Sequence, residues 1–154
     1  NSRFEEAQRT GQPLAVIMID VDHFRRFNEE HGHDAGDDVL RKVGQTLKAS
    51  VRPYDMAARY GGEEFSLILP STSESGAMRM AERAREAVEQ IEYTTPDGMA
   101  CRITISLGCA VFPQAAQLPE ALLKAADTAL YAAKRAGRNR ATLFEVAEGD
   151  GKAA

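Results

Sequence analysis

Leu14-Ala15-Val16-Ile17-Met18-Ile19-Asp20-Val21-Asp22 is the segment from which the architecture can be worked out. Its first six residues are apolar and include β-branched side chains, and it ends with two aspartates. A short continuous apolar run of this kind is typical of a strand that is buried on both faces, and it is too short to cross a bilayer. We therefore predict a central β-strand with acidic side chains at its end.

Helices and further strands are predicted on both sides of this strand. Apolar periodicity and cap signals predict helices over about residues 2–10, 23–30, 34–52, 72–91 and 119–136, and strands over 57–60, 65–69, 101–111 and 142–146. Asp34 is the expected N-cap of the third helix, and Ser71-x-x-Glu74 is the expected capping box of the fourth. The order indicates an α+β domain over residues 1–146 with a mainly antiparallel central sheet flanked by helices, and a disordered tail over 147–154.

The composition of the 154 residues is that of one globular domain. Hydrophobic residues make up 44% and charged residues 27%, which excludes collagen-like and low-complexity classes. The net charge of −4 argues against a surface for duplex nucleic acid. Cys101 and Cys109 lie on one predicted strand, too far apart to pair, so we expect a cytoplasmic location. Because the first residue is Asn1, we expect a longer protein whose other segments supply a regulatory domain or a tether to the inner membrane.

Two acidic motifs are candidates for a metal site. Asp20 and Asp22 share a face because side chains on a strand have a period of two, and carboxylates at the end of a buried strand can hold a hard cation such as Mg²⁺. Gly61-Gly62-Glu63-Glu64 joins two predicted strands as a tight hairpin, where Glu63 could face Asp20 across two metal ions. The alternatives are a charged strand end and a solvated hairpin, and the second motif alone is more typical of a solvated turn.

Three polar pairs are candidates for nucleotide binding. Lys134-x-x-x-Arg138 could hold a terminal phosphate, although cations at the end of a helix are favourable in any case. Asn28 and Asp37 could recognise the edge of guanine, since a carboxylate accepts from its ring N–H and exocyclic amine, and helix capping is the alternative for Asp37. Arg52-x-x-Asp55 alone is more typical of a surface ion pair.

Taken together, four blocks resemble the signature of the GGDEF-domain diguanylate cyclases in order and spacing. They are Asp20-Val-Asp-His-Phe-Arg-Arg-Phe-Asn28, Gly32-His33-x-x-Gly36-Asp37, Arg59-Tyr60-Gly61-Gly62-Glu63-Glu64-Phe65 and Ala126-Asp127-x-Ala129-x-Tyr131-x-Ala133-Lys134-x-x-Gly137-Arg138-Asn139. The resemblance covers nearly the whole chain, and Glu63 makes it the GGEEF variant of the family. It implies a palm-like nucleotidyl cyclase fold with a ferredoxin-like core.

The resemblance also implies an activity and its cofactors. Two GTP molecules are joined into cyclic di-GMP with release of pyrophosphate, at a homodimer in which each domain holds one GTP. The side chains of Asp20 and Glu63 and the carbonyl of Val21 would bind two Mg²⁺ or Mn²⁺ ions. Glu64 would orient or deprotonate the attacking 3′-hydroxyl.

The same resemblance assigns residues to the substrate. Asn28 and Asp37 would recognise guanine in a pocket lined by Phe24 and Leu40. Backbone N–H groups of His23, Phe24 and Arg25 would hold the phosphates, Gly61 and Gly62 would let a phosphate approach the hairpin, and Lys134 and Arg138 would bind the γ-phosphate. Arg25 stands where the family most often has lysine. The arginine keeps the positive charge of the lysine but has a different shape.

A second, inhibitory site for the product is implied as well. Arg52 and Asp55 would bind cyclic di-GMP, and Arg83 would complete the site from a neighbouring domain. The main alternative for the whole chain is a catalytically silent module that binds GTP or cyclic di-GMP and signals by contact. A cyclase that makes another cyclic nucleotide is a further alternative, against which Asn28 and Asp37 argue.

Overall fold

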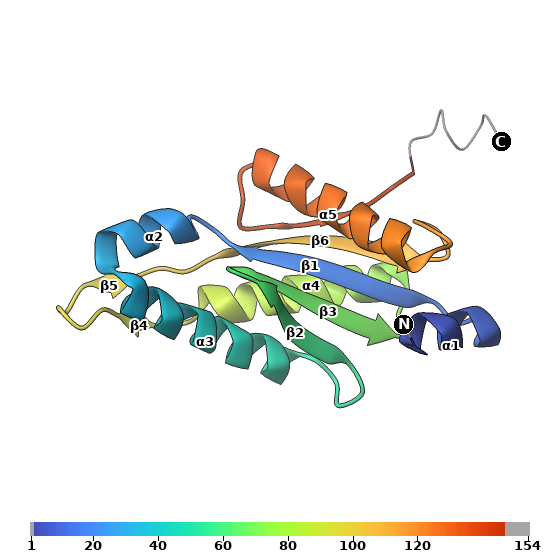
Figure 1. The fold of residues 1–154 in the computed structure, drawn as a ribbon, viewed down its shortest axis with the longest axis horizontal. Coiled ribbons are helices and arrows are strands. Elements are labelled where there is room, and N and C mark those ends of the chain that lie inside the picture. The colour runs from blue at the N-terminus through green and yellow to red at the C-terminus, as the bar shows by residue number, and fades with distance from the viewer. Residues whose placement is uncertain (1, 147–154) are drawn as a thin grey trace.

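The computed structural model describes residues 2–146, and the tail predicted over 147–154 lies outside this range. The elements run in the order α1 (Ser2–Thr10), β1 (Leu14–Val21), α2 (Phe24–His31), α3 (His33–Ser50), β2 (Met56–Gly61), β3 (Glu64–Pro70), α4 (Glu74–Glu89), β4 (Tyr93–Thr94), β5 (Ala100–Cys101), β6 (Ile105–Phe112), α5 (Pro119–Arg135) and β7 (Ala141–Leu143) (Figure 1). This is the predicted α+β architecture.

The main sheet has five strands in the order β2-β3-β1-β6-β7, with β1 at its centre as predicted. β1 is antiparallel to both neighbours, and the β6–β7 pair is parallel. The register sets Asp20 opposite Glu64 of β3 on one side and opposite Ser106 of β6 on the other. Directly opposed residues share a face, so these three polar side chains form one row across the sheet.

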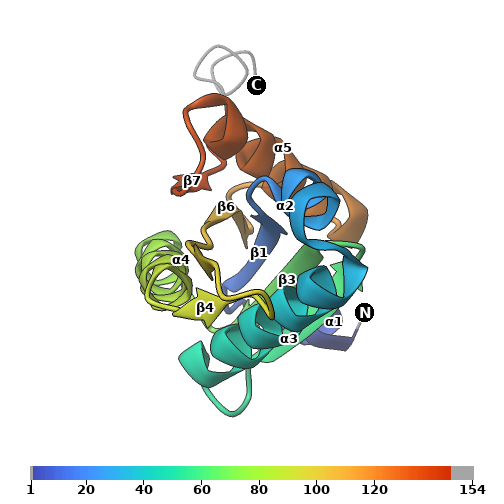
Figure 2. The same ribbon diagram turned by 90° about the vertical axis from the view of Figure 1, so that its left-hand side faces the viewer.

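The central strand is buried on both faces because helices cover each of them. Ala15, Ile17 and Ile19 belong to the core beneath α3 and α4. The alternating residues Val16 and Met18 belong to a second core beneath α1 and α5. Figure 2 shows α3 and α4 on one side of the sheet and α5 on the other. Asp20 continues the row of Val16 and Met18 and therefore emerges on the side of α5.

Gly108 allows α5 to lie directly on the sheet. A Cβ atom at this position would come within 2.1 Å of the Leu130 nitrogen and 2.3 Å of the Ala126 oxygen, both backbone atoms of α5. Only glycine permits so close an approach. The contact brings the C-terminal end of α5 against the end of β1, where the acidic residues lie.

Three local predictions are wrong. α3 begins at His33 after Gly32, so Asp34 lies in its first turn and is not its N-cap. The cap of α4 is Ser73, whose hydroxyl accepts from the Gly76 nitrogen at 3.2 Å, in place of Ser71. The strand predicted over 101–111 is two strands: β5 pairs with β4 in a separate ribbon, and β6 pairs with β1.

The two cysteines accordingly lie in different surroundings. Cys109 on β6 is fully buried, and burial raises the pKa of its thiol to about 12. Cys101 on β5 is only half-buried, and its sulfur lies 3.9 Å from the His31 Nε2 atom. Over residues 2–146, no helix is both long and apolar enough to span a membrane.

Candidate active site

The acidic end of β1 is the centre of the site. The Asp20 side chain is buried, with 6% of the residue exposed. Its Oδ2 atom accepts a hydrogen bond from the Lys134 ammonium group on α5. Its Oδ1 atom is buried and has no hydrogen-bond partner within the described chain. Burial raises the pKa of Asp20, Glu63 and Asp22 act in the same direction, and Lys134 opposes them.

Glu64 is the direct cross-strand neighbour of Asp20. Burial raises the pKa of Glu64, and the carboxylates of Asp20 and Asp127 raise it further. Asp127, on α5, also has a raised pKa through burial. Asp127 lies in the fourth signature block, but the sequence indicates no role for it. Three carboxylates from three elements thus share one electrostatic environment.

The hairpin turn places Glu63 beside the same strand end. The Glu63 carbonyl oxygen accepts from the Val21 nitrogen at 3.3 Å, which ties the turn to β1. The Glu63 side chain lines a pocket of about 470 Å³. Glu64 is therefore the residue directly opposite Asp20 in the sheet, whereas Glu63 faces the pocket next to it.

This pocket collects most of the residues predicted to bind substrate. Its lining includes Phe24, Arg25, Asn28, Asp37, Leu40, Gly62 and Glu63. Phe24 and Leu40 are buried and form the apolar part, while Arg25 and Asp37 are exposed at its rim. His23 adopts a left-handed conformation, with φ of 57°, and no side chain caps the helix α2 that follows. The N–H groups of the first turn of α2 are left without a side-chain cap and suit an anion.

Asn28 is held against Gly36, a residue to which the sequence analysis gave no role. A Cβ atom at Gly36 would lie 1.7 Å from the Asn28 Oδ1 atom and 3.1 Å from the Phe24 Cζ atom. Oδ1 is buried and lacks a hydrogen-bond partner among residues 2–146. Glycine at position 36 therefore makes room for an amide whose oxygen has no hydrogen-bond partner among residues 2–146.

The Lys134 ammonium group is paired with the Asp20 carboxylate. Arg138 lies just beyond α5 in a turn of positive φ angles and is exposed. The two predicted phosphate ligands thus stand at the same end of α5. Lys134 touches the acidic cluster through Asp20.

Asp22 has a different environment from the one its spacing predicted. Its Oδ1 atom accepts from the Ser106 hydroxyl at 2.6 Å, and Oδ2 accepts from the Thr104 hydroxyl at 2.7 Å and the Asn139 nitrogen at 3.0 Å. Three donors thus bind this carboxylate. The cation site at the two aspartates stays a prediction, and the resemblance assigns only Asp20 of the pair to the metal. The partners come from distant segments, and no local signal identifies them.

A second pocket, of about 440 Å³, contains the predicted product site. Arg52 donates to both Asp55 oxygens at 2.9 Å, and to the Pro70 carbonyl and Thr72 hydroxyl oxygens. Arg83 lines the same pocket of the same chain, together with Arg79, which the sequence analysis missed. Arg83, on α4, therefore lies at the pocket of Arg52 within one chain. Its contribution from a neighbouring domain stays a prediction.

Comparison with known proteins agrees with this geometry. Residues 1–140 match the family described as diguanylate cyclase, GGDEF domain. Diguanylate cyclase DosC of Escherichia coli K12 is 44% identical over 139 residues, which is 90% of this chain and 30% of DosC. The chain thus spans about a third of the length of this curated relative.

Solved structures give the same result for the fold. The GGDEF domain of YfiN (TpbB) from Pseudomonas aeruginosa matches with a TM-score of 0.89 and 34% identity, covering 94% of this chain and 90% of that one. The GGDEF domain of DgcB from Caulobacter crescentus, solved in complex with cyclic di-GMP, matches with a TM-score of 0.87 and 35% identity, covering 94% and 85%. The chain belongs to the GGDEF-domain family of diguanylate cyclases.

Proposed function

We propose that this chain is a catalytic domain that condenses two GTP molecules into cyclic di-GMP and releases pyrophosphate. The observation that carries the proposal is the buried Asp20 carboxylate, which has one unpartnered oxygen and lies opposite Glu64 beside a nucleotide-sized pocket. The names of the matching relatives support the same activity.

The acidic cluster suits a pair of divalent cations, Mg²⁺ or Mn²⁺. The Asp20 Oδ1 atom is a buried acceptor without a partner among residues 2–146. The groups around it offer oxygen ligands, which these ions prefer. Within the described residues, no three His, Cys, Asp or Glu side chains already converge as a ligand set. Asp20 and Glu63 would be the two side-chain ligands, and the Val21 carbonyl and the nucleotide would supply other oxygens. When bound, such ions lower the pKa of a hydroxyl and neutralise phosphate charge.

The base and the phosphates would be bound by different elements. Asn28 and Asp37 offer an amide and a carboxylate to guanine, whose N–H donors adenine lacks. The N–H groups at the start of α2 and the hairpin glycines Gly61 and Gly62 are the groups that can approach the phosphates closely. Arg138 would bind the γ-phosphate, and Lys134 would join it on leaving Asp20.

The reaction joins the substrates of two domains. The 3′-oxygen of one nucleotide attacks the α-phosphorus of the other, the bond to the β-phosphate breaks, and pyrophosphate leaves. Glu64 would orient the 3′-hydroxyl or accept its proton, for which a raised pKa is favourable. The 3′-oxygen of the second nucleotide then attacks the α-phosphorus of the first, which closes the ring and releases a second pyrophosphate. A homodimer supplies the proximity of the two substrates that one domain lacks. Arg52, held by Asp55, and Arg83 would bind cyclic di-GMP at the second pocket. The bound product would then inhibit the cyclase activity.

The test is to incubate the protein with GTP and Mg²⁺ at several protein concentrations and separate the nucleotides by chromatography. We expect cyclic di-GMP, with a yield that rises more steeply than the protein concentration, and no product from Glu63→Gln. If the protein is silent, a fused dimeric coiled coil is added to bring two domains together. Silence of the fusion, with GTP still bound, would refute the catalytic proposal and support the binding module.

A further inference from the structure

Asn139 is the residue through which the loop after α5 is attached to the rest of the domain. Its backbone nitrogen donates to the Asp22 Oδ2 atom at 3.0 Å. Its side-chain nitrogen donates to the Glu89 Oε2 atom at 2.7 Å, and its side-chain oxygen accepts from the Arg85 guanidinium at 3.0 Å. Each hydrogen-bonding group that the amide offers to α4 is therefore used.

The two partners on α4 are themselves fixed. Arg85 pairs with Glu82 and lies 3.5 Å from Glu89. Glu89 also pairs with Arg102, and hydrogen bonds from Asn139 and Arg102 lower the pKa of Glu89. The side chains of Arg85 and Glu89 are only 16% and 20% exposed, whereas that of Arg102 is 70% exposed. Asn139 thus binds a semi-buried ion pair, and Arg102 binds the same pair from outside.

The segment that Asn139 anchors has an unusual backbone. Gly137, Arg138 and Asn139 all have positive φ angles, of 126°, 64° and 48°. Left-handed conformations at residues other than glycine are sparsely populated and persist where the surroundings determine them. Asn tolerates this region better than most residues, but Arg138 has no such preference. Backbone hydrogen bonds from Gly137 to the Lys134 oxygen and from Arg138 to the Ala133 oxygen tie the turn to α5. The contacts of Asn139 tie it to Asp22 and to α4.

We propose that Asn139 is a positioning residue, which holds the turn that presents Arg138 to the terminal phosphates of the nucleotide. It does so from two sides, through Asp22 at the end of β1 and through the Arg85–Glu89 pair of α4. The proposal rests on the proposed function in one respect, namely that Arg138 binds the γ-phosphate.

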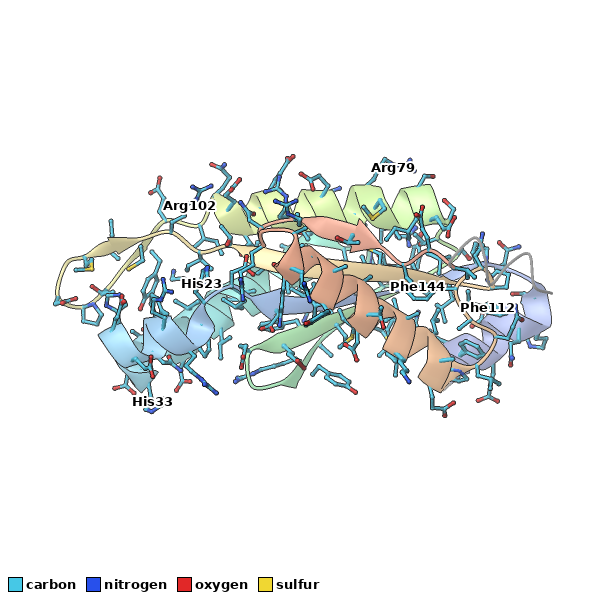
Figure 3. All side chains as sticks on the ribbon, turned by 90° about the horizontal axis from the view of Figure 1, so that it is seen from above. His23, His33, Arg79, Arg102, Phe112 and Phe144 are labelled. Carbon is cyan, nitrogen blue, oxygen red and sulfur yellow. The ribbon has the colours of Figure 1, made fainter. Side chains whose placement is uncertain are left out.

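The same helix carries the arginines of the second pocket. Arg79 and Arg83 lie on α4 before Arg85 and Glu89. Figure 3 shows Arg79 on α4 and Arg102 beyond its opposite end, beside the Glu89 contact. α4 therefore carries both the arginines of the second pocket and the two partners of the Asn139 side chain.

The test compares two ligands that differ at the γ-phosphate. Titration calorimetry with Mg²⁺ measures the affinity for 3′-deoxy-GTP, which cannot be joined to a second nucleotide, and for GDP. Asn139→Ala and Asn139→Gly should each lower the affinity for 3′-deoxy-GTP by about tenfold and the affinity for GDP by less than about twofold. Tenfold is the lower end of what residues that support a ligand-binding side chain contribute. Glycine accepts φ of 48° without strain, so this variant isolates the loss of the amide contacts. Arg138→Ala should give the same pattern.

Arg102→Ala is the matched control, because Arg102 contacts Glu89 but not Asn139. Both affinities should stay within about twofold of those of the unaltered protein. Should the Asn139 variants fail to fold, Glu89→Ala removes the acceptor that α4 offers to the Asn139 amide. Glu89→Gln keeps an acceptor, so only Glu89→Ala should lose affinity for 3′-deoxy-GTP. Unaltered binding by Asn139→Gly, or equal losses for GDP and 3′-deoxy-GTP, would overturn the proposal. If Arg138→Ala alone has no effect, Arg138 is not a phosphate ligand, and this part of the proposed function falls together with the inference.

Discussion

Gly36→Ala should separate nucleotide affinity from stability. The added Cβ would lie 1.7 Å from the Asn28 Oδ1 atom, and Cβ atoms essentially never come closer than 3.0 Å to such a neighbour, so the amide must retreat by about 1.3 Å. A hydrogen bond of ordinary length, about 2.9 Å, stretched by that amount is no longer one. Leaving a buried donor or acceptor unpaired costs about 1–3 kcal/mol. The affinity for 3′-deoxy-GTP should therefore fall by about tenfold to a hundredfold.

The free energy of unfolding should change far less. Alanine is better than glycine inside a helix by up to about 1 kcal/mol, and an Asn28 side chain displaced from its preferred rotamer costs about 0.5–1.5 kcal/mol. These contributions nearly cancel, so the melting temperature should stay within about 4 °C. Gly44→Ala in the same helix is the control, because its Cβ would meet only the Phe65 ring at 3.4 Å. The Gly44→Ala variant should be more stable, because alanine is favoured in a helix, and its affinity for 3′-deoxy-GTP should be unchanged.

A double-mutant cycle with Asn28→Ala identifies the cause. If Gly36→Ala acts by moving the Asn28 amide, it should cause no further loss of nucleotide affinity in the Asn28→Ala protein. The effects of the two substitutions on affinity should then be strongly non-additive. Calorimetry on the four proteins measures this coupling. Additive losses, or a Gly36→Ala variant that binds as the unaltered protein does, would refute the argument that Gly36 makes room for Asn28.

Four other predictions concern the remaining groups. Asp37→Ala should reduce the preference for GTP over ITP, which lacks the exocyclic amine, in competition binding measurements. Arg83→Ala should raise the cyclic di-GMP concentration for half-inhibition by about tenfold or more, and the melting temperature should not change. Arg52→Ala should also destabilise the protein, because the fully buried Asp55 side chain loses its partner. Since burial raises the pKa of Asp20 and Glu64, Mg²⁺-dependent nucleotide affinity should fall on acidification at a higher pH than for ordinary carboxyl groups; affinity independent of pH down to 4 would contradict this. Cys109, with a pKa of about 12, is about one part in ten thousand thiolate at pH 8, so a thiol reagent should label it only after unfolding, and rapid labelling in the native state would place it elsewhere.

The elements that the sequence predicted well are those specified by local periodicity. β1, the β2–β3 hairpin and the helices follow from apolar spacing within each segment. The misplaced cap of α4 shows the limit, since Ser71, Thr72 and Ser73 are all suitable cap residues. The choice depends on a tertiary contact, because Thr72 is bound by Arg52 from the end of α3. Likewise, the alternation over 101–111 continues through two strands, and only the change of partner from β4 to β1 separates them.

The same distinction applies to the site. Asp20 and Glu64, like the pocket residues Asn28 and Asp37, stood out by residue type in short motifs. Ser106 did not, and Gly36 and Asn139 stood in signature blocks without an assigned role. The partners of all three lie elsewhere in the chain. A glycine in a helix, a serine in a strand and an asparagine in a turn each have an ordinary local explanation, and their roles appear only when Asn28, Asp22 and Glu89 are placed beside them.

The position of the acidic centre follows from the alternation of β1. One row of this strand packs under α3 and α4, and the other row, Val16 and Met18, packs under α5. The next residue of the second row is Asp20, which must emerge beneath the last turn of α5 because Gly108 lets that helix lie on the sheet. A carboxylate in an apolar row is costly unless it is paired, and Lys134 in the last turn of α5 supplies only one partner. The other oxygen finds no partner in the described part of the chain. The fold thus leaves a buried acceptor where β1, the hairpin and α5 meet.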